Sequence, residues 1–483
     1  MSRIQTNIPA MQAVHRLQRN QQDLNVRLER LATGLRINRG ADDPAGLIAS
    51  EQLRMEIRGI QQAVENSTRA NSVMSVAEGA LQEASALLLD LQGLVIQAAN
   101  EAGLTDQEVQ ANQLQIDSIL ASLDRIANTT TFAGKKLLDG SQAYLTSGIP
   151  PAALPSVQLF AARVPHGGTR QVRVQVTQSA QTAQIAFVGS NTTSPSTTSA
   201  TTVQIKGTLG TELLTFASGT TLGQIRAAIN NVAVVTGVSA VVSTAGVAGV
   251  ASALLLNSTD VGSDAFVSVA PIGGNFIVTG NSNTTARDTG VDAGVLIDGQ
   301  QSLVKGLQAD VRSGGLDARI FLARAFAQTL SSATFTITGG GAVFQLTPEV
   351  TPNGQIQIGF NAVSTTQLGN PVTGLLYTLR SGGDNDVASR NFLAAQQIVE
   401  EAIDQVSFYR GRLGNIRLNQ IDPNINSQKV ALENVTASES MIRDADMAVE
   451  ISALTRAQIL IQTTQNTLQI ANSVPNLVLS LLG

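Results

Sequence analysis

The sequence predicts an α+β protein with a discontinuous core of long helices from both chain ends and a β-rich insert between them. Glycine and proline are sparse in residues 1–140 and 388–483, whereas residues 141–387 hold 30 of the 42 glycines. The middle segment is also poor in charge. Apolar residues recur at a helical period in both end segments, and this combination indicates helical ends around a β-rich or loop-rich middle.

The longest periodic segment runs from Ala49 to Ala98. Steps that alternate between four and three residues meet apolar side chains at nearly every position. A mean step of 3.5 residues over seven heptads is typical of a coiled-coil seam, here about 75 Å long. Asp43 followed by Pro44 fits an N-cap and first turn. With partner helices near Ile116 and in 392–416 we expect one bundle. Its predicted seam residues are Leu53, Ile60, Met74, Leu81, Leu88, Leu91, Val95, Val399, Ile403 and Val406.

Both extreme ends carry apolar stripes of their own. A pair of helices alone cannot bury such stripes well, so we expect the ends to be poorly ordered in a single copy. Packing against further copies would bury them. An ordinary bundle core would explain any one stripe, but stripes at both termini favour self-assembly. The predicted assembly residues are Ile4, Ile8, Met11, Leu24, Leu28, Leu31, Leu454, Ile461, Leu468, Val478, Leu479, Leu481 and Leu482.

Composition argues against several classes of function. The net charge of −5 disfavours a nucleic-acid binder. Without cysteine there is no thiolate nucleophile or cysteine-ligated zinc. The two histidines, His15 and His166, lack metal-ligand spacing, and no nucleophile elbow, phosphate-binding loop or dinucleotide-binding pattern occurs. We therefore expect no enzyme, and no catalytic, cofactor or metal site.

Membrane insertion and signal-directed secretion are also disfavoured. The uncharged stretch 231–256 is long enough to span a bilayer, but its Gly, Ser, Thr and Val content favours short strands and turns. The first residues show no apolar signal-peptide segment. If the protein is exported, we expect another route.

Two motifs near the chain ends resemble bacterial flagellin. The first is RLATGLRIN at 30–38, followed by GADDPAGL at 40–47. The second is NVTASES at 434–440, followed by IRDADMA at 442–448. The resemblance covers 1–140 and about 388–483, and two long motifs in the right order are highly specific.

The resemblance implies a structural subunit that polymerises into the helical flagellar filament used for swimming. Segments 1–42 and 441–483 would pair as inner-tube helices, 43–140 and 388–440 would form the surrounding bundle, and 141–387 would face outward. The implied partners are further copies of the chain, an export chaperone, the filament cap, hook-associated proteins and the type III export apparatus. The implied location is extracellular, without a cleaved signal peptide. Two alternatives stay open: a hook-associated junction protein, or a filament whose insert is adhesive or binds a receptor.

The middle of the chain resembles the small insert motif that is named for its Ile-Asn pair, at about 203–270. The matching residues are ELLTFA at 212–217, TLGQIRAAIN at 221–230 and GVSAVV at 237–242. This pattern predicts a strand, a short amphipathic helix and further strands. The implied role is surface display and lateral packing.

Two further site hypotheses come from the same segments. The family's innate-immune receptor segment aligns with 88–100, where Leu94 and Gln97 fit. Asp90 stands where receptor-active members often carry Arg, which argues against recognition by the Toll-like receptor. The hydroxyl-rich stretch 190–202 predicts an exposed loop. A sharper hypothesis is O-glycosylation, at Ser194, Ser196, Thr197 and Thr198.

Overall fold

The computed structural model describes residues 6–100, 103–164, 168–187, 197, 199–243, 253–274, 276, 278, 286–313 and 315–482; for 475–482 it describes only the helical backbone. The chain divides into two compact units. The first comprises Met1–Asn71, Gln345–Gln355 and Arg417–Gly483, and the second comprises Ser72–Phe344 and Ile356–Ile416. Each unit thus joins segments that are far apart in the sequence.

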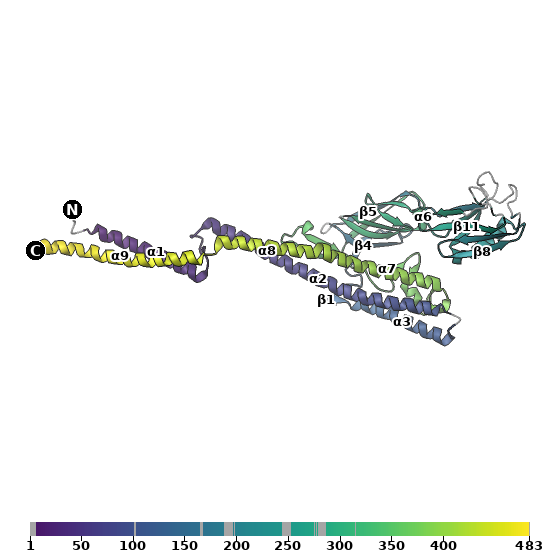
Figure 1. Cartoon of the computed structure of the whole chain (residues 1–483), viewed down its shortest axis with the longest axis horizontal. Helices are drawn as coiled ribbons and strands as arrows, with labels where there is room; N and C mark the ends of the chain where they lie inside the picture. Colours follow the sequence, from purple (N-terminus) through teal and green to yellow (C-terminus); the bar gives the residue numbers. More distant parts are fainter. Residues whose placement is uncertain are drawn as a thin grey trace. The chain divides into compact units, whose positions relative to one another are not determined.

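The first unit is built from helices of both chain ends. Helix α1 (Ile8–Thr33) lies antiparallel to α9 (Met447–Leu482), and Figure 1 shows the two side by side. The first part of α2 (Pro44–Ala98) runs beside α8 (Asp422–Arg443), which follows the π-helical turn η5 (Arg417–Ile421).

Polar side chains begin α2 and connect it to α8. The Asp43 carboxylate accepts a hydrogen bond of 2.9 Å from Gly46 N, which is the N-cap arrangement expected from the sequence. Ser50 Oγ donates to Glu439 Oε1 over 3.0 Å, and Asn71 Nδ2 donates to Asp422 Oδ1 over 2.7 Å. These contacts fix an antiparallel register between the two helices.

Three helices form the bundle of the second unit. The remainder of α2 packs with α3 (Asp106–Thr129) and α7 (Phe392–Ile416), so that Val95, Ile116 and Ala395 line one small cavity. Thr105 and Glu108 begin α3 with a capping box, in which each side chain accepts from the other residue's backbone N–H.

The burial of α2 follows the heptad period. Leu88 has no exposed surface, whereas its neighbour Leu89 is 55% exposed. A 3.5-residue period keeps one face of a long helix toward its partners. From Ile60 onward every step of the seam is buried, at Ile60, Ala63, Ser67, Ala70, Met74, Ala77, Leu81, Ala84, Leu88, Leu91, Val95 and Ala98.

A β-sandwich follows the bundle in the second unit. Its sheets have the strand orders β14-β13-β5-β18-β3 and β15-β16-β17-β4, all antiparallel, and they share one apolar core. Alternating Val172, Val174 and Val176 supply the inner face of the central strand. The strands are β3 (Tyr144–Ser147), β4 (Ser156–Ala162), β5 (Arg170–Gln178), β13 (Gly294–Ile297), β14 (Gln300–Gln301), β15 (Leu303–Lys305), β16 (Gln308–Ser313), β17 (Leu316–Phe321) and β18 (Ser332–Gly340).

A smaller α/β module has its own core. Its sheets have the orders β12-β11-β7-β8 and β6-β10-β9, and the buried face of α4 contributes Ile225 and Ile229 to the core. The strand–helix–strand order matches the sequence prediction. Its elements are β6 (Gln184–Phe187), β7 (Thr201–Lys206), β8 (Thr211–Phe216), α4 (Leu222–Asn231), α5 (Ala233–Thr236), β9 (Val238–Ser243), β10 (Ala253–Ser258), β11 (Phe266–Gly273) and β12 (Ala286–Thr289).

Short elements complete the chain, and the segment before α7 packs on α3. Asp124 accepts hydrogen bonds from the backbone and hydroxyl of Thr365, and Asp117 accepts from Ser381 N over 3.0 Å. The short elements are β1 (Thr131–Phe132), β2 (Lys135–Lys136), α6 (Arg324–Ala327), β19 (Ala342–Gln345), η2 (Pro352–Gly354), β20 (Gln355–Ile358), β21 (Gly369–Asn370), β22 (Gly374–Leu375), η3 (Leu376–Leu379) and η4 (Val387–Ser389).

Aromatic and charged side chains attach the sandwich to α7. The Phe160 and Phe408 ring centroids lie 5.1 Å apart, and the Arg319 guanidinium lies 4.4 Å from the Phe408 centroid. Arg412 Nη1 lies 3.0 Å from Asp317 Oδ2. Helical ends around a β-rich middle confirm the predicted α+β fold class.

Candidate assembly surface at the chain ends

Two asparagines connect α1 to α9 along their length. Asn7 Nδ2 donates to Ala471 O over 2.8 Å, and Asn20 Nδ2 donates to Thr464 Oγ1 over 3.0 Å. Asn7 also caps α1, because its Oδ1 accepts from Ala10 N. These contacts hold together residues more than 400 positions apart in the sequence.

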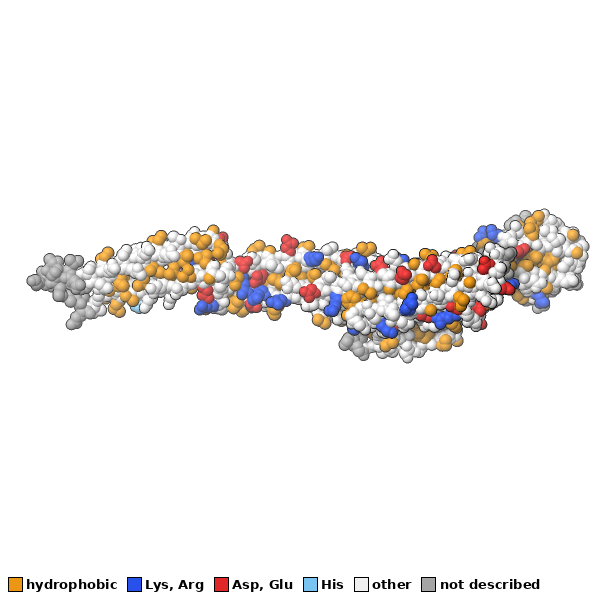
Figure 2. Space-filling view, turned by 90° about the horizontal axis from the view of Figure 1, so that it is seen from below, with side chains coloured by type: hydrophobic (Ala, Val, Ile, Leu, Met, Phe, Trp, Pro, Cys, Tyr) orange, Lys and Arg blue, Asp and Glu red, His pale blue; other side chains and the backbone are white. Residues whose placement is uncertain are grey.

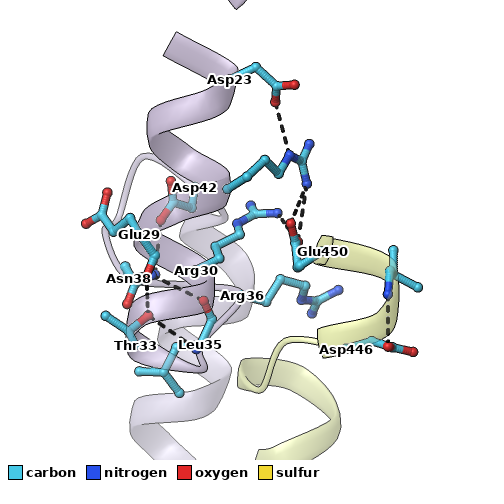
Figure 3. A network of polar contacts seen from close by, with 12 residues as sticks. Asp23, Glu29, Arg30, Thr33, Leu35, Arg36, Asn38, Asp42, Asp446 and Glu450 are labelled. Carbon is cyan, nitrogen blue, oxygen red and sulfur yellow. Dashed lines mark hydrogen bonds and ion pairs between the residues drawn. The ribbon is translucent and has the colours of Figure 1, made fainter. Parts of the chain in front are cut away.

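Glu450 joins the two helices at the opposite end of the pair. Its carboxylate lies 2.9 Å from Arg27 Nη1 and 3.1 Å from Arg30 Nη1, and its side chain is only 7% exposed. Arg27 is also paired with Asp23 over 3.1 Å. Burial acts to raise the pKa of Glu450, but hydrogen bonds from the two arginines outweigh it, so the pKa lies below its usual value. Figure 3 shows this carboxylate between the helices.

A short β-bridge closes the pair where both chain segments leave it. α1 ends at Gly34, whose φ of 73° is the left-handed conformation that glycine adopts at low cost. Arg36 N then donates to Arg443 O over 2.7 Å, and Ala445 N donates to Gly34 O over 2.9 Å. The incoming and outgoing chain segments are therefore tied to each other by main-chain hydrogen bonds.

Two aspartates order the linkers on either side of the bridge. Asp42 Oδ2 accepts from Arg39 N and Asn38 N over 2.9 and 3.0 Å, and the bond from Arg39 N contributes most to holding the pKa of Asp42 below its usual value. Asp446 Oδ1 accepts from Ala448 N over 2.9 Å and begins α9. Both aspartates lie within the motifs that resemble flagellin.

The α1–α9 pair exposes an unusual amount of apolar surface. Among its described hydrophobic side chains only Ala13, Ala457 and Ala471 are buried. Figure 2 shows hydrophobic side chains spread along this pair. A soluble chain rarely exposes so many large apolar residues unless another molecule covers them. The exposed ones are Ile8, Met11, Val14 and Leu28 of α1, and Met447, Val449, Ile451, Ile459, Leu460, Ile470 and Val474 of α9.

The predicted assembly residues fall into three groups. Ile8, Met11 and Leu28 are exposed. Five are half-buried, and they are Leu24, Leu31, Leu454, Ile461 and Leu468. Ile4 and the side chains of Val478, Leu479, Leu481 and Leu482 lie outside the described residues.

The predicted seam residues lie in the two helical cores. Leu53 and Ile403 are half-buried. The others are buried, and they are Ile60, Met74, Leu81, Leu88, Leu91, Val95, Val399 and Val406. The residues named for receptor contact lie on α2, with Leu94 half-buried and Gln97 and Asp90 exposed.

Of the four residues predicted as glycosylation sites, only Thr197 lies among the described residues. Thr197 is 2% exposed, and its Oγ1 donates to Ala217 O over 2.6 Å. A buried, bonded hydroxyl is not available to a modifying enzyme in the folded chain. Ser194, Ser196 and Thr198 lie outside the described residues.

Sequence reasoning missed the polar contacts within the pair. A signal was nevertheless present, because Glu450 lies within the apolar stripe of its helix, four residues before Leu454. Arg27 and Arg30, three residues apart, share one face of the other helix. A lone carboxylate on an apolar stripe, opposite two such arginines, indicates a pair between helices.

Three family descriptions match the sequence. The bacterial flagellin N-terminal helical region matches residues 4–143, the bacterial flagellin C-terminal helical region matches 396–482, and the flagellin hook IN motif matches 202–260. Together these matches cover more than half of the chain. The chain belongs to the bacterial flagellin family.

Individual flagellins align with this chain, some over nearly its whole length and others over only part of it. The flagellin of Clostridium tyrobutyricum is 28% identical over 97% of this chain and 98% of its own length. The flagellin of Bacillus subtilis is 43% identical over 29% of this chain and 46% of its own length. A solved structure, flagellar hook associated protein-3 of Legionella pneumophila, is 12% identical with a TM-score of 0.31, over 81% of this chain and 98% of that one.

Membership of the flagellin family establishes the function. The chain is a structural subunit of the bacterial flagellar filament, and its place is outside the cell in that filament. The family is one of structural proteins and not of enzymes. No helix in the described parts of the chain is both long enough and apolar enough to cross a bilayer. The sequence predictions of family, function and non-enzymatic role are thus confirmed.

Proposed function

We propose that α1 and α9 are the elements through which this flagellin polymerises. In this proposal 1–42 and 441–483 form the innermost layer of the filament, 43–140 and 388–440 form the next layer, and 141–387 faces outward. The exposed apolar side chains of the α1–α9 pair support it, because they have no covering partner in a single copy.

Burial of this surface would provide the free energy of assembly. Each buried Å² of apolar surface contributes about 25 cal/mol. A helical polymer needs one patch that meets a different patch on the next copy, repeated without closure. The pair offers two such faces, because both helices expose apolar residues along their length.

Substitution of exposed residues tests the proposal without unfolding the chain. Ile459→Gln and Ile470→Gln change side chains that are 56% and 65% exposed, so we expect the monomer to fold normally. We expect seeded filament growth to need a higher monomer concentration, by about tenfold for each substitution. Growth at the wild-type concentration would contradict the proposal.

Ile272→Gln is the matched control. Ile272 is 61% exposed on β11, in the module that the proposal places on the outside of the filament. We expect this variant to polymerise like the wild type. If it fails equally, loss of any exposed isoleucine impairs growth, and the assignment to α1 and α9 is wrong.

The remaining partners belong to the same proposal. The apolar face of α9 would be covered by an export chaperone until the chain passes the type III export apparatus, without cleavage of a signal peptide. At the two filament ends the same faces would meet the cap and the hook-associated proteins. A chaperone that binds α9 should protect Ile459 and Ile470 from solvent, which hydrogen exchange of the complex measures. Unchanged exchange in 447–474 would contradict this assignment.

A further inference from the structure

The N-terminal part of α1 and nearly all of α9 carry positive charge alone. Residues 1–22 and 451–483 contain four arginines and no Asp or Glu. Arg16, Arg19 and Arg456 are exposed, and no ion pair joins any of them to another described residue. The nearest carboxylate along α1, Asp23, is already paired with Arg27.

This charge opposes polymerisation through α1 and α9 alone. If copies pack only these pairs against one another, the arginines of neighbouring copies come together without a carboxylate in the same stretch. Like charges that approach in a partly desolvated contact repel each other. A carboxylate from another part of the next copy would offset this repulsion.

The strongest opposite charge on the helices lies at the end of α2 and along α3. Residues 72–129 contain eight acidic side chains and a single basic one. Three of the acidic ones are already engaged: Asp117 and Asp124 with the segment before α7, and Glu108 in its capping box. Glu83 and Asp90 remain exposed without a described partner.

Glu83 and Asp90 lie on the exposed side of α2, which also carries apolar side chains. They are seven residues apart, which places them in one row along the helix. Leu89 and Ile96 are each 55% exposed and form a second row, about 100° around the helix from the first. This face thus combines carboxylates with apolar side chains, whereas the α1–α9 surface combines arginines with apolar side chains.

We propose that the α2 face around Glu83 and Asp90 is the docking surface for Arg16 and Arg19 of a second copy of this chain. The inference rests on the proposed role of α1 and α9 and names the surface that they meet. Apolar contact would supply most of the affinity, and the charge pairs would set register and growth rate.

A charge exchange tests the pairing in full-length filaments. Glu83→Arg with Asp90→Arg, and separately Arg16→Glu with Arg19→Glu, should each slow seeded growth by about tenfold or more at low salt. The chain that carries all four substitutions should recover most of the wild-type rate. Circular dichroism should show wild-type helix content in every variant, because none of the four side chains has a described ion pair within the chain.

Glu56→Arg with Glu65→Arg is the matched control. Both glutamates are exposed on the first part of α2 without a described partner, and the change in net charge is identical. This variant should grow like the wild type. The inference is overturned if this control slows seeded growth as much as Glu83→Arg with Asp90→Arg does. It is also overturned if the chain with all four substitutions grows no faster than either double variant. Ile459→Gln tests the proposed role of α1 and α9 independently of the docking surface on α2. If Ile459→Gln impairs growth, that role is supported even when the docking inference is wrong. If Ile459→Gln does not impair growth, the role itself is contradicted.

Discussion

Asn230 takes the place of a strand neighbour for Ala240. The Asn230 Oδ1 atom accepts from Ala240 N over 2.7 Å, and Asn230 Nδ2 donates to Ala240 O over 3.1 Å. One amide side chain thus satisfies both main-chain groups of a buried residue on β9. The preceding Ile229 is fully buried in the module's core. This arrangement gives a physical reason for an Ile-Asn pair at the end of α4.

Asn230→Ala should destabilise the small module. It leaves the N–H and C=O of Ala240 without partners, and we expect a loss of about 1–2 kcal/mol. Asn230→Asp keeps the acceptor but loses the donor, so its loss should be smaller. Urea unfolding of the full chain, followed by hydrogen exchange in 201–273, measures both. Equal losses for the two variants would contradict the two-bond account.

Leu88 and Leu89 test the seam of α2. Leu88→Ala empties a fully buried position and should cost about 2–5 kcal/mol. Leu89→Ala changes a side chain that is 55% exposed and should alter monomer stability by less than about 0.5 kcal/mol. Chemical denaturation of the monomer compares them. Similar losses for both would show that the seam does not face the core.

The α1–α9 pair should loosen in acid. Because the pKa of Glu450 is held below its ordinary value of 4.5, its ion pairs stabilise the pair above the unfolded pKa, and this stabilisation is lost as pH falls through the lower, folded pKa. The protection of amides in 8–33 and 447–474, measured against their intrinsic exchange rates at each pH, should therefore fall below about pH 4.5. Glu450→Gln should remove this dependence on pH, whereas Glu433→Gln, on the exposed side of α8, should keep it.

Arg412 and Asp317 should be strongly coupled. Burial raises the pKa of Asp317, and removal of Arg412 leaves that carboxylate partly buried without its partner. Arg412→Ala should therefore lower the free energy of unfolding by about 2–4 kcal/mol. This loss is smaller than for a fully buried ion pair, because Asp317 retains some exposure. Arg412→Met combined with Asp317→Leu should cost much less. A double-mutant cycle by thermal unfolding measures the coupling, and additive losses would refute it.

Two of the three tyrosines should resist ionisation. Burial raises the pKa of both Tyr144 and Tyr409 to about 12. Folded-state stability from these groups is complete below their unfolded pKa near 10 and falls as pH rises toward 12. Ultraviolet titration should show two phenols that ionise only at the higher pH. Tyr409→Phe should remove one of them, and a single transition near pH 10 for all three would contradict the burial.

The helical ends could be predicted because period alone determines which face of a long helix is buried. Every seam step from Ile60 to Ala98 follows from counting residues. The assembly surface was only partly predictable, because a heptad stripe gives the face toward the partner helix but not which residues stay uncovered. Leu454 and Ile461 are half-buried, whereas the neighbouring Ile459 and Leu460 are exposed.

Pairings between segments that are distant in the sequence could not be predicted from the spacing of apolar residues. The bonds from Arg27 and Arg30 to Glu450 depend on the register between two helices at opposite ends of the chain, and no local pattern fixes that register. The strand orders of the insert could not be predicted for the same reason, since β5 pairs with β13 and β18 across more than a hundred residues. Only its local strand and helix order could be predicted.

The hydrogen bond from Asn7 to Ala471 closes a loop of nearly the whole polypeptide. We expect such a long-range contact to form late in folding, because closing a long loop costs more chain entropy than closing a short one. During synthesis α1 therefore has no partner helix until α9 has been made. A chain truncated before α9 cannot form this pair, so under the proposed role of α1 and α9 only full-length molecules would polymerise.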